Sequence, residues 1–141
     1  MEITSHILIQ EWHNYTNYLI VDDEFRGSIS LLIYKEPREY DVEALICDLW
    51  VDKDHRRLGI AKHLIGKAEA IAKEKGYKYI SLWWDSRDTS NDIYEWYMSR
   101  GYDSKIIIPP TYRFNYQKEL LVKNYDRRRN TQSRKGKCCR D

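Results

Sequence analysis

The order of hydrophobic and polar residues divides the chain into short apolar runs and two amphipathic segments. Runs that alternate or are continuously apolar predict strands over 3–12, 18–21, 27–34, 44–51, 77–84, 102–108 and 111–122. Residues 60–75 repeat apolar side chains at helical spacing, with Lys62, Glu69 and other charged residues on the opposite face. A second helix is expected to begin near Thr89 or Ser90 and to end near Arg100, just before a glycine.

These elements follow one another as four strands, a helix, a strand, a second helix and two strands. The order predicts an α+β fold of the three-layer α/β type, with a mixed, mostly antiparallel central sheet of about six to seven strands flanked by helices. Residues 44–51 are apolar on both sides except at Asp48, which is typical of a central strand. About five residues, 13–17, separate the first two predicted strands.

Charge is unevenly distributed along the 141 residues, and this divides the chain into one domain, 1–122, and a basic tail, 123–141. The tail holds eight Lys or Arg residues and two acids, a net charge of +6, and its few apolar residues predict a flexible extension. The domain carries a net charge of −4, which favours a cationic small-molecule partner. Contact of the tail with a nucleic acid or another acidic partner is the alternative to a solvated extension.

Composition excludes several classes of protein. The mean hydropathy is −0.77 and there is no apolar run of 18 residues, so no membrane span is expected. The first residues show no basic segment before an apolar one, so no secretory leader is predicted. The three cysteines and four histidines show no metal-binding spacing, and no metal is expected. A reduced, cytoplasmic protein is the resulting expectation.

The stretch 47–64 carries the most informative local chemistry. An apolar strand leads into a basic turn that contains Gly59, and an amphipathic helix begins directly after it. The first turn of a helix presents unpaired N–H groups and a partial positive charge, to which a phosphate binds well. Arg56 and Arg57 add positive charge, and Gly59 lets an anion approach the backbone. The alternative is a plain strand-to-helix turn with two solvated arginines.

A second pattern, on the later helix and its exit, makes a family resemblance apparent. Ile93, Trp96, Tyr97, Gly101 and Tyr102 form I-x-x-W-Y-x-x-x-G-Y. This resembles the A-x-x-F-Y-x-x-x-G-F helix of the GNAT N-acetyltransferase superfamily. The earlier turn, R-x-x-G-x-A over 56–61, resembles the acetyl-CoA motif R/Q-x-x-G-x-G/A of the same family. The resemblance covers residues 18 to about 120, and the order and spacing of the motifs agree with it.

The resemblance implies acetyl-CoA as co-substrate and assigns roles to particular residues. The strand residues Leu49, Trp50 and Val51 would pair with the pantetheine arm, and one of their amides would polarise the acetyl carbonyl. The turn would hold the pyrophosphate through backbone amides; its residues are Arg56, Arg57, Leu58, Gly59, Ile60 and Ala61. Tyr97 would protonate the leaving thiolate, and core packing is its alternative role.

The sequence also departs from the family pattern. Ile93 stands where a small residue is usual, and Ser90 stands where Asn is usual. The family usually places two helices between its first two strands, and here these N-terminal helices are short or missing. Because those helices often wall the acceptor site, the acceptor pocket is expected to be open or to be completed by a second subunit in a homodimer.

Two carboxylates are candidates for the base that frees the acceptor amine. An unperturbed alkylamine has a pKa of about 10.4 and is almost fully protonated at pH 7, so a base or a water relay is useful. Asp48 is the first choice because an unpartnered carboxylate in an apolar central strand is costly, so a partner, a water or a function is expected for it. Asp85, at the end of the next strand, is the second choice, with a turn role as its alternative.

The sequence therefore predicts an N-acetyltransferase that moves an acetyl group directly from acetyl-CoA to a primary amine, with a small cationic acceptor favoured. One alternative is acetylation of a protein or tRNA-linked amine, steered by the basic tail. Another is a coenzyme A-binding module without catalysis, which the residues at 90 and 93 permit.

Overall fold

The computed structural model describes residues 2–88 and 90–125. Its β-strands are β1 (Ser5–Glu11), β2 (Tyr15–Asp22), β3 (Gly27–Tyr34), β4 (Ala44–Val51), β5 (Tyr79–Asp85), β6 (Tyr102–Ile108) and β7 (Lys118–Asn124). Its α-helices are α1 (Ile60–Glu74) and α2 (Asn91–Ser99), and single 3-10 turns lie at η1 (Glu39–Asp41) and η2 (Lys53–His55).

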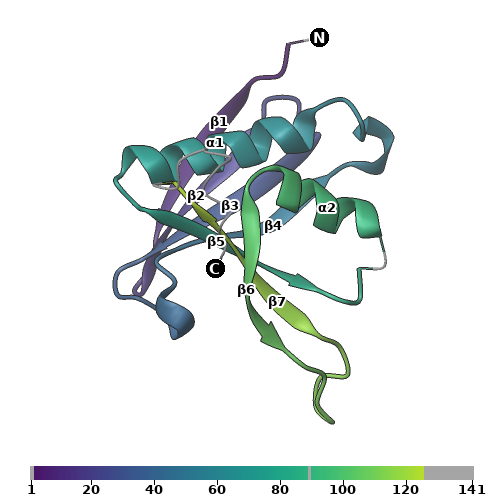
Figure 1. Cartoon of the computed structure of the whole chain (residues 1–141). Helices are drawn as coiled ribbons and strands as arrows, with labels where there is room; N and C mark the ends of the chain where they lie inside the picture. The colour runs from purple at the N-terminus through teal and green to yellow at the C-terminus, as the bar shows by residue number, and fades with distance from the viewer. Residues whose placement is uncertain (1, 89, 126–141) are drawn as a thin grey trace, which may run out of the picture.

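The strands form one seven-stranded sheet in the order β1-β2-β3-β4-β5-β7-β6. Only the β4–β5 pair is parallel, whereas the other five pairs are antiparallel. This confirms the predicted α+β class with a mixed, mostly antiparallel sheet. Both helices lie over the same face of the sheet (Figure 1), so the described residues build two layers rather than three. The missing layer is the one that helices between the first two strands would supply.

Helix α1 covers the middle of the sheet because its apolar face is continuous. The side chains that it buries together with β2, β3 and β4 are Ile20, Ile29, Leu31, Ala44, Ile46, Ile60, Leu64, Ile65, Ala68 and Ala72. Each buried Leu or Ile contributes about 1.5–3 kcal/mol relative to exposure. Gly76 follows the helix with a φ of +91°, as expected for the glycine that ends a helix.

The predicted strand bounds differ from the structure where pairing with a neighbouring strand, rather than the local residue pattern, decides where a strand begins. The bounds of β3, β4 and β6 agree with the predicted 27–34, 44–51 and 102–108. The predicted strand 111–122 begins only at Lys118, so its first part was wrong. Residues 111–114 instead form a turn, in which the Thr111 N–H donates to the Phe114 carbonyl.

Glu69 contradicts the prediction that it lies on the polar face of the first helix. It is only 6% exposed and faces the end of α2 and strand β7. A buried carboxylate is tolerated only with partners, and Glu69 has several.

Strands β4 and β5 pair over only two residues of each strand. Register partners are Leu45 with Ser81 and Ile46 with Leu82, although β4 continues to Val51 and β5 to Asp85. By contrast, β5 pairs with β7 along its whole length. The two central strands therefore run apart toward their carboxyl ends (Figure 1), and the sheet is split beside the start of α1.

The first two strands are joined by a tight turn, in which the Trp12 N–H donates to the Tyr15 carbonyl at 2.8 Å. This confirms that no helix separates them. The face of the sheet opposite α1 and α2 consequently has no helix over it among the described residues.

Strand β7 ends at Asn124, two residues beyond the predicted domain boundary. The basic residues 126–141 and Thr89, a predicted helix cap, lie outside the described residues. In the described ranges, neither helix has the length and apolar character that crossing a membrane requires.

Candidate active-site cleft

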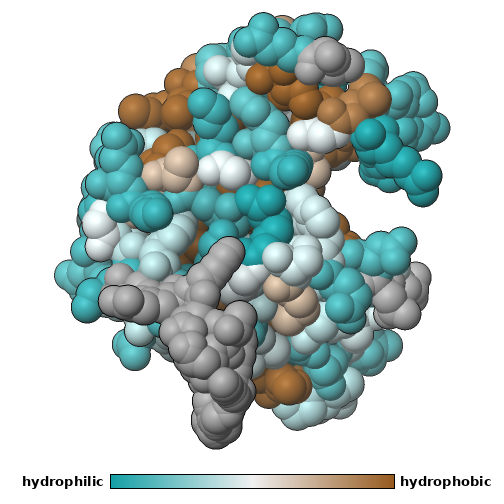
Figure 2. Space-filling model, turned by 45° about the horizontal axis from the view of Figure 1, so that its top comes forward, coloured by the Kyte–Doolittle hydropathy of each residue, from teal (hydrophilic) through white to brown (hydrophobic). Residues whose placement is uncertain are grey.

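A cleft of about 730 Å³ lies between the turn before α1 and helix α2, with the end of β4 as its floor. Its lining residues are Leu49, Val51, Arg56, Arg57, Ala61, Asp88, Ser90, Asp92, Ile93, Trp96 and Tyr97. Figure 2 shows a deep hollow on the side of the molecule where this turn and α2 lie in Figure 1. The volume lies within the range of small-molecule and cofactor sites.

The first wall is built mainly from backbone at the start of α1. Gly59 is the N-cap residue and has a φ of +87°, a backbone conformation that residues other than glycine rarely adopt. The His63 N–H donates to the Gly59 carbonyl at 3.0 Å and opens the intrahelical ladder. The N–H groups at positions 60–62 therefore lack intrahelical partners and are available to an anion.

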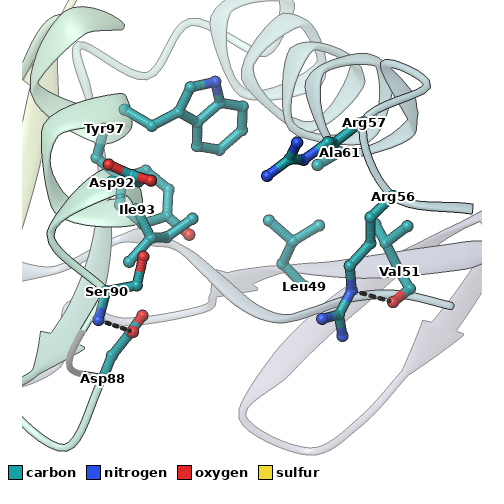
Figure 3. A pocket seen from close by; sticks show the side chains of 11 residues that line it. Leu49, Val51, Arg56, Arg57, Ala61, Asp88, Ser90, Asp92, Ile93 and Tyr97 are labelled. Carbon is teal, nitrogen blue, oxygen red and sulfur yellow. Dashed lines mark hydrogen bonds between the residues drawn. The ribbon is translucent and has the colours of Figure 1, made fainter. Parts of the chain in front are cut away.

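The two arginines of this wall have different roles. The Arg56 Nε donates to the Val51 carbonyl at 3.2 Å, so its guanidinium lies over the end of β4. The Arg57 side chain points across the cleft toward α2 (Figure 3) and has no hydrogen bond or ion pair with another described residue. Arg57 is therefore the arginine of this wall whose guanidinium is available to an anionic ligand.

The floor depends on an irregularity in β4. Pairing of β3 with β4 shifts between Ser28 and Ser30, and Asp48 within this bulge has a φ of +55°. After the bulge, the side chains of Leu49 and Val51 face the cleft, whereas Trp50 is 51% exposed and is not part of the lining. Because β5 does not pair with β4 beyond residue 46, the main chain on this edge is open to a ligand.

The second wall is the face of α2 that carries Tyr97. This tyrosine is 9% exposed, and burial, with a smaller effect of the Asp88 charge, raises its pKa to about 12. The rings of Trp96 and Tyr102 pack against it at centroid distances of 5.4 and 5.8 Å. No hydrogen bond joins its hydroxyl to another described residue, so the group is available to a ligand in the cleft.

The two predicted bases lie outside the lining of the cleft. Asp48 is exposed rather than buried, since the bulge turns it away from the core. Asp85 accepts two hydrogen bonds from the Arg87 guanidinium, both at 2.9 Å. These bonds, with help from the Arg87 backbone N–H, hold the pKa of Asp85 below its usual value.

Three other predicted residues contribute no side chain to the cleft. Leu58 is 44% exposed, Ile60 is buried in the core at 1%, and Gly59 has no side chain. They can offer only backbone groups to a ligand in the cleft, and a backbone role is the one that the sequence predicted for the turn. Ala61 does line the cleft, as does Ile93 at the position where the sequence departs from the family pattern.

Sequence reasoning missed two acids of the second wall, Asp88 and Asp92. Both lie beside the start of α2, and Asp88 accepts a hydrogen bond from the Ser90 N–H at 3.0 Å (Figure 3). Acids are common at helix starts because they favour the helix dipole, so their presence alone does not indicate a binding site. Within the described ranges, no group of three or more His, Cys, Asp or Glu residues is arranged to hold a metal ion.

The cleft thus joins a helix start with unpaired N–H groups, the open edge of a split sheet and a tyrosine on the facing helix, a combination that suits an extended anionic ligand. Residues 2–102 match the model of the Acetyltransferase (GNAT) family. The chain therefore belongs to the GNAT family of acetyltransferases. No curated protein matches it significantly in a search by sequence.

Solved structures with similar folds include enzymes with different acceptors. A GNAT family acetyltransferase from Elizabethkingia anophelis with acetyl-CoA bound is 17% identical, with a TM-score of 0.63 over 77% of this chain and 76% of that one. The ribosomal-protein-S18-alanine N-acetyltransferase from Escherichia coli is 14% identical, with a TM-score of 0.62 and coverage of 82% and 72%. Nourseothricin acetyltransferase is 15% identical, with a TM-score of 0.60 and coverage of 79% and 64%.

Proposed function

We propose that this protein is an N-acetyltransferase that moves the acetyl group of acetyl-CoA directly to a primary amine. One observation carries the proposal: a single cleft has the unpaired N–H groups after Gly59 on one wall and the Tyr97 hydroxyl on the other. The first wall suits the pyrophosphate of coenzyme A and the second suits its sulfur.

The residues present fit acetyl-CoA at both ends of the cleft. The backbone at 57–61 would hold the pyrophosphate, with Arg57 supplying a free guanidinium. Residues 49–51 would hold the pantetheine arm, because the unpaired edge of β4 can accept an extended ligand in the manner of an added strand. When bound, acetyl-CoA supplies the reactive thioester.

Tyr97 is proposed as the acid of the reaction. As the amine nitrogen bonds to the acetyl carbon, the carbon–sulfur bond breaks and the electron pair goes to sulfur, which takes the Tyr97 proton. As the amide forms, its nitrogen loses a second proton, distinct from the one that the ammonium form gives up before it attacks, and this second proton returns the tyrosine to its neutral form through water. A pKa of about 12 keeps the hydroxyl protonated at neutral pH, before each transfer.

Asp48 is proposed as the group that accepts, through water, the first proton, which the ammonium form of the acceptor loses before it attacks. It lies at the bulge of β4, beside the open edge of the split, whereas Asp85 is already held by Arg87. Cys47 is the neighbouring nucleophile, but burial raises the pKa of its thiol to about 11, which leaves little thiolate at neutral pH. This supports direct transfer over an acetyl-cysteine intermediate.

A small cationic amine is the acceptor that we favour. The net charge of −4 over residues 1–122 and the two acids on the α2 wall attract a cation. A protein amino terminus is the second candidate, because the tight β1–β2 turn leaves one face of the sheet open to a large acceptor. On that face, a second subunit would complete the acceptor pocket.

Release of free thiol from acetyl-CoA over a panel of amines tests this function. The panel contains a polyamine, an aminoglycoside, a peptide with a free amino terminus and the same peptide acetylated. Turnover with the polyamine or the aminoglycoside supports the first acceptor class, and turnover with only the free peptide supports the second. Coenzyme A binding without turnover on any amine would contradict the enzyme and favour a binding module.

A further inference from the structure

A buried carboxylate on α1 connects this helix to the end of α2. Glu69 is 6% exposed, and its partners come from β6, from β7 and from the residue after α2. They are Arg100, Tyr102 and Lys123. A buried carboxylate costs free energy unless it is hydrogen-bonded or ion-paired. Because these bonds must be kept, Glu69 holds its partner side chains in fixed positions.

Arg100 attaches the last turn of α2 to this carboxylate. Its Nη2 lies 2.5 Å from Glu69 Oε1, and its guanidinium lies 5.5 Å from the centre of the Trp96 ring. The Arg100 N–H also donates to the Trp96 and Tyr97 carbonyls, at 3.2 and 3.0 Å. The ion pair is therefore joined directly to the helical turn that carries the proposed acid.

Tyr102 forms a second connection from the same carboxylate. Its hydroxyl donates to Glu69 Oε2 at 2.9 Å, and its ring meets the Tyr97 ring edge-on, with centroids 5.8 Å apart and planes at 70°. Tyr102 is only 1% exposed, so its ring has little freedom to move. Glu69 therefore holds the hydroxyl of Tyr102, and the ring of Tyr102 packs against the ring of Tyr97.

Tyr97 depends on this packing for its orientation. Its hydroxyl has no hydrogen-bond partner among the described residues, and helix α2 spans only nine residues with no side-chain hydrogen bond at its N-cap. An acid must be held near the reacting atom by groups whose own side chains are fixed. The Trp96 and Tyr102 rings are the aromatic contacts of Tyr97, and both lead back to Glu69.

We propose that Glu69 is a positioning residue for Tyr97, acting through Arg100 and Tyr102. This inference rests on the proposed function, in which Tyr97 is the acid. Glu69 does not line the cleft, so we expect its effect to appear in kcat rather than in the affinity for acetyl-CoA.

A double-mutant cycle between Glu69→Gln and Tyr97→Phe tests the inference. We expect Glu69→Gln to lower kcat by roughly 10–100-fold, as expected for a displaced acid, while the affinity for coenzyme A stays unchanged. In the Tyr97→Phe background, the same substitution should lower kcat no further, because the group that it positions is gone. Equal losses in both backgrounds would show a merely structural role and overturn the inference.

Two Tyr→Phe variants keep the test decisive if Glu69→Gln does not fold. Tyr102→Phe removes one hydrogen bond to Glu69 and keeps the ring. Tyr125→Phe is its matched control, because the Tyr125 hydroxyl donates to the Glu69 backbone carbonyl at 2.6 Å, whereas the ring partners of Tyr97 are Trp96 and Tyr102. We expect Tyr102→Phe alone to lower kcat; equal kcat values in the two variants would overturn the inference. Full activity of Tyr97→Phe would overturn the acid role and this inference with it, whereas an additive cycle overturns the inference alone.

Discussion

The two walls of the cleft present different kinds of chemical group to a ligand. The α1 wall offers main-chain N–H groups, a left-handed glycine and one free guanidinium. The α2 wall offers side chains, which include a buried tyrosine and two acids. The first depends on backbone conformation and the second on the placement of particular functional groups.

Under the proposed function, this difference predicts that the α1 wall serves binding and the α2 wall serves the chemical step. A backbone site holds a phosphate whatever the neighbouring side chains are, provided that the φ value and the small residues are kept. A side-chain acid works only with its own hydroxyl in place. Changes in the α1 wall should therefore alter the affinity for coenzyme A, and changes in the α2 wall should alter kcat.

Tyr97→Phe should have the largest effect. Loss of the hydroxyl removes the proposed acid and should lower kcat by roughly 10–1000-fold, with little change in coenzyme A affinity. Steady-state kinetics and a coenzyme A titration on the same variant measure both.

Since burial raises the pKa of Tyr97 from 10 to about 12, the acid stays protonated up to pH 10 in the folded protein. Deprotonation of Tyr97 should therefore cause no fall in the kcat of the native protein up to pH 10. Full activity of the variant would return Tyr97 to a packing role.

Gly59→Val should have the next largest effect, on the opposite wall. A branched side chain strains the φ of +87° and blocks the approach of the pyrophosphate, so coenzyme A affinity should fall by ~1–3 kcal/mol, roughly 5–150-fold. Gly76→Val is the matched control, because Gly76 has a φ of +91° at the other end of the same helix. Equal affinities for coenzyme A in the two folded variants would contradict the placement of the pyrophosphate at this turn.

Arg57→Gln should have a smaller effect on binding. Its guanidinium is exposed and worth roughly 1 kcal/mol to a bound phosphate, so coenzyme A affinity should fall about fivefold, and less at high salt. Arg56→Gln is the comparison, since the Arg56 guanidinium is already bonded to the Val51 carbonyl. Calorimetric titration at two salt concentrations measures both, and a larger loss in the Arg56 variant would reverse the assignment.

Asp48→Asn should have the smallest effect, and one that depends on pH. The substitution keeps the shape of the side chain but removes its basicity. We expect kcat/KM to fall mainly below pH ~8, where the amine is most protonated, with partial recovery at higher pH. Asp85→Asn should show less of this dependence, because Arg87 already occupies that carboxylate. Superimposable pH profiles for Asp48→Asn and the native protein would assign a structural role to Asp48.

The candidate site was predictable where the evidence is local in the sequence. Gly59, the two arginines and the pattern around Tyr97 mark the two walls, and the family match confirms the resemblance that they support. The exposure of Asp48 was not predictable, because it follows from a bulge that only the pairing of β3 with β4 creates. Glu69 was misplaced for a similar reason, since its partners lie 31 to 54 residues further along the chain.

The sequence by itself determined the elements: the bounds of β3, β4 and β6, the length of α1 and the glycines at its ends. Side-chain periodicity and the freedom of glycine at positive φ are properties of neighbouring residues, so they can be read locally. The tertiary structure alone decided that β4 and β5 part after two paired residues and that Asp88 and Asp92 face the basic turn across the gap. Strand divergence and the meeting of two walls depend on contacts between distant segments, which no local pattern records.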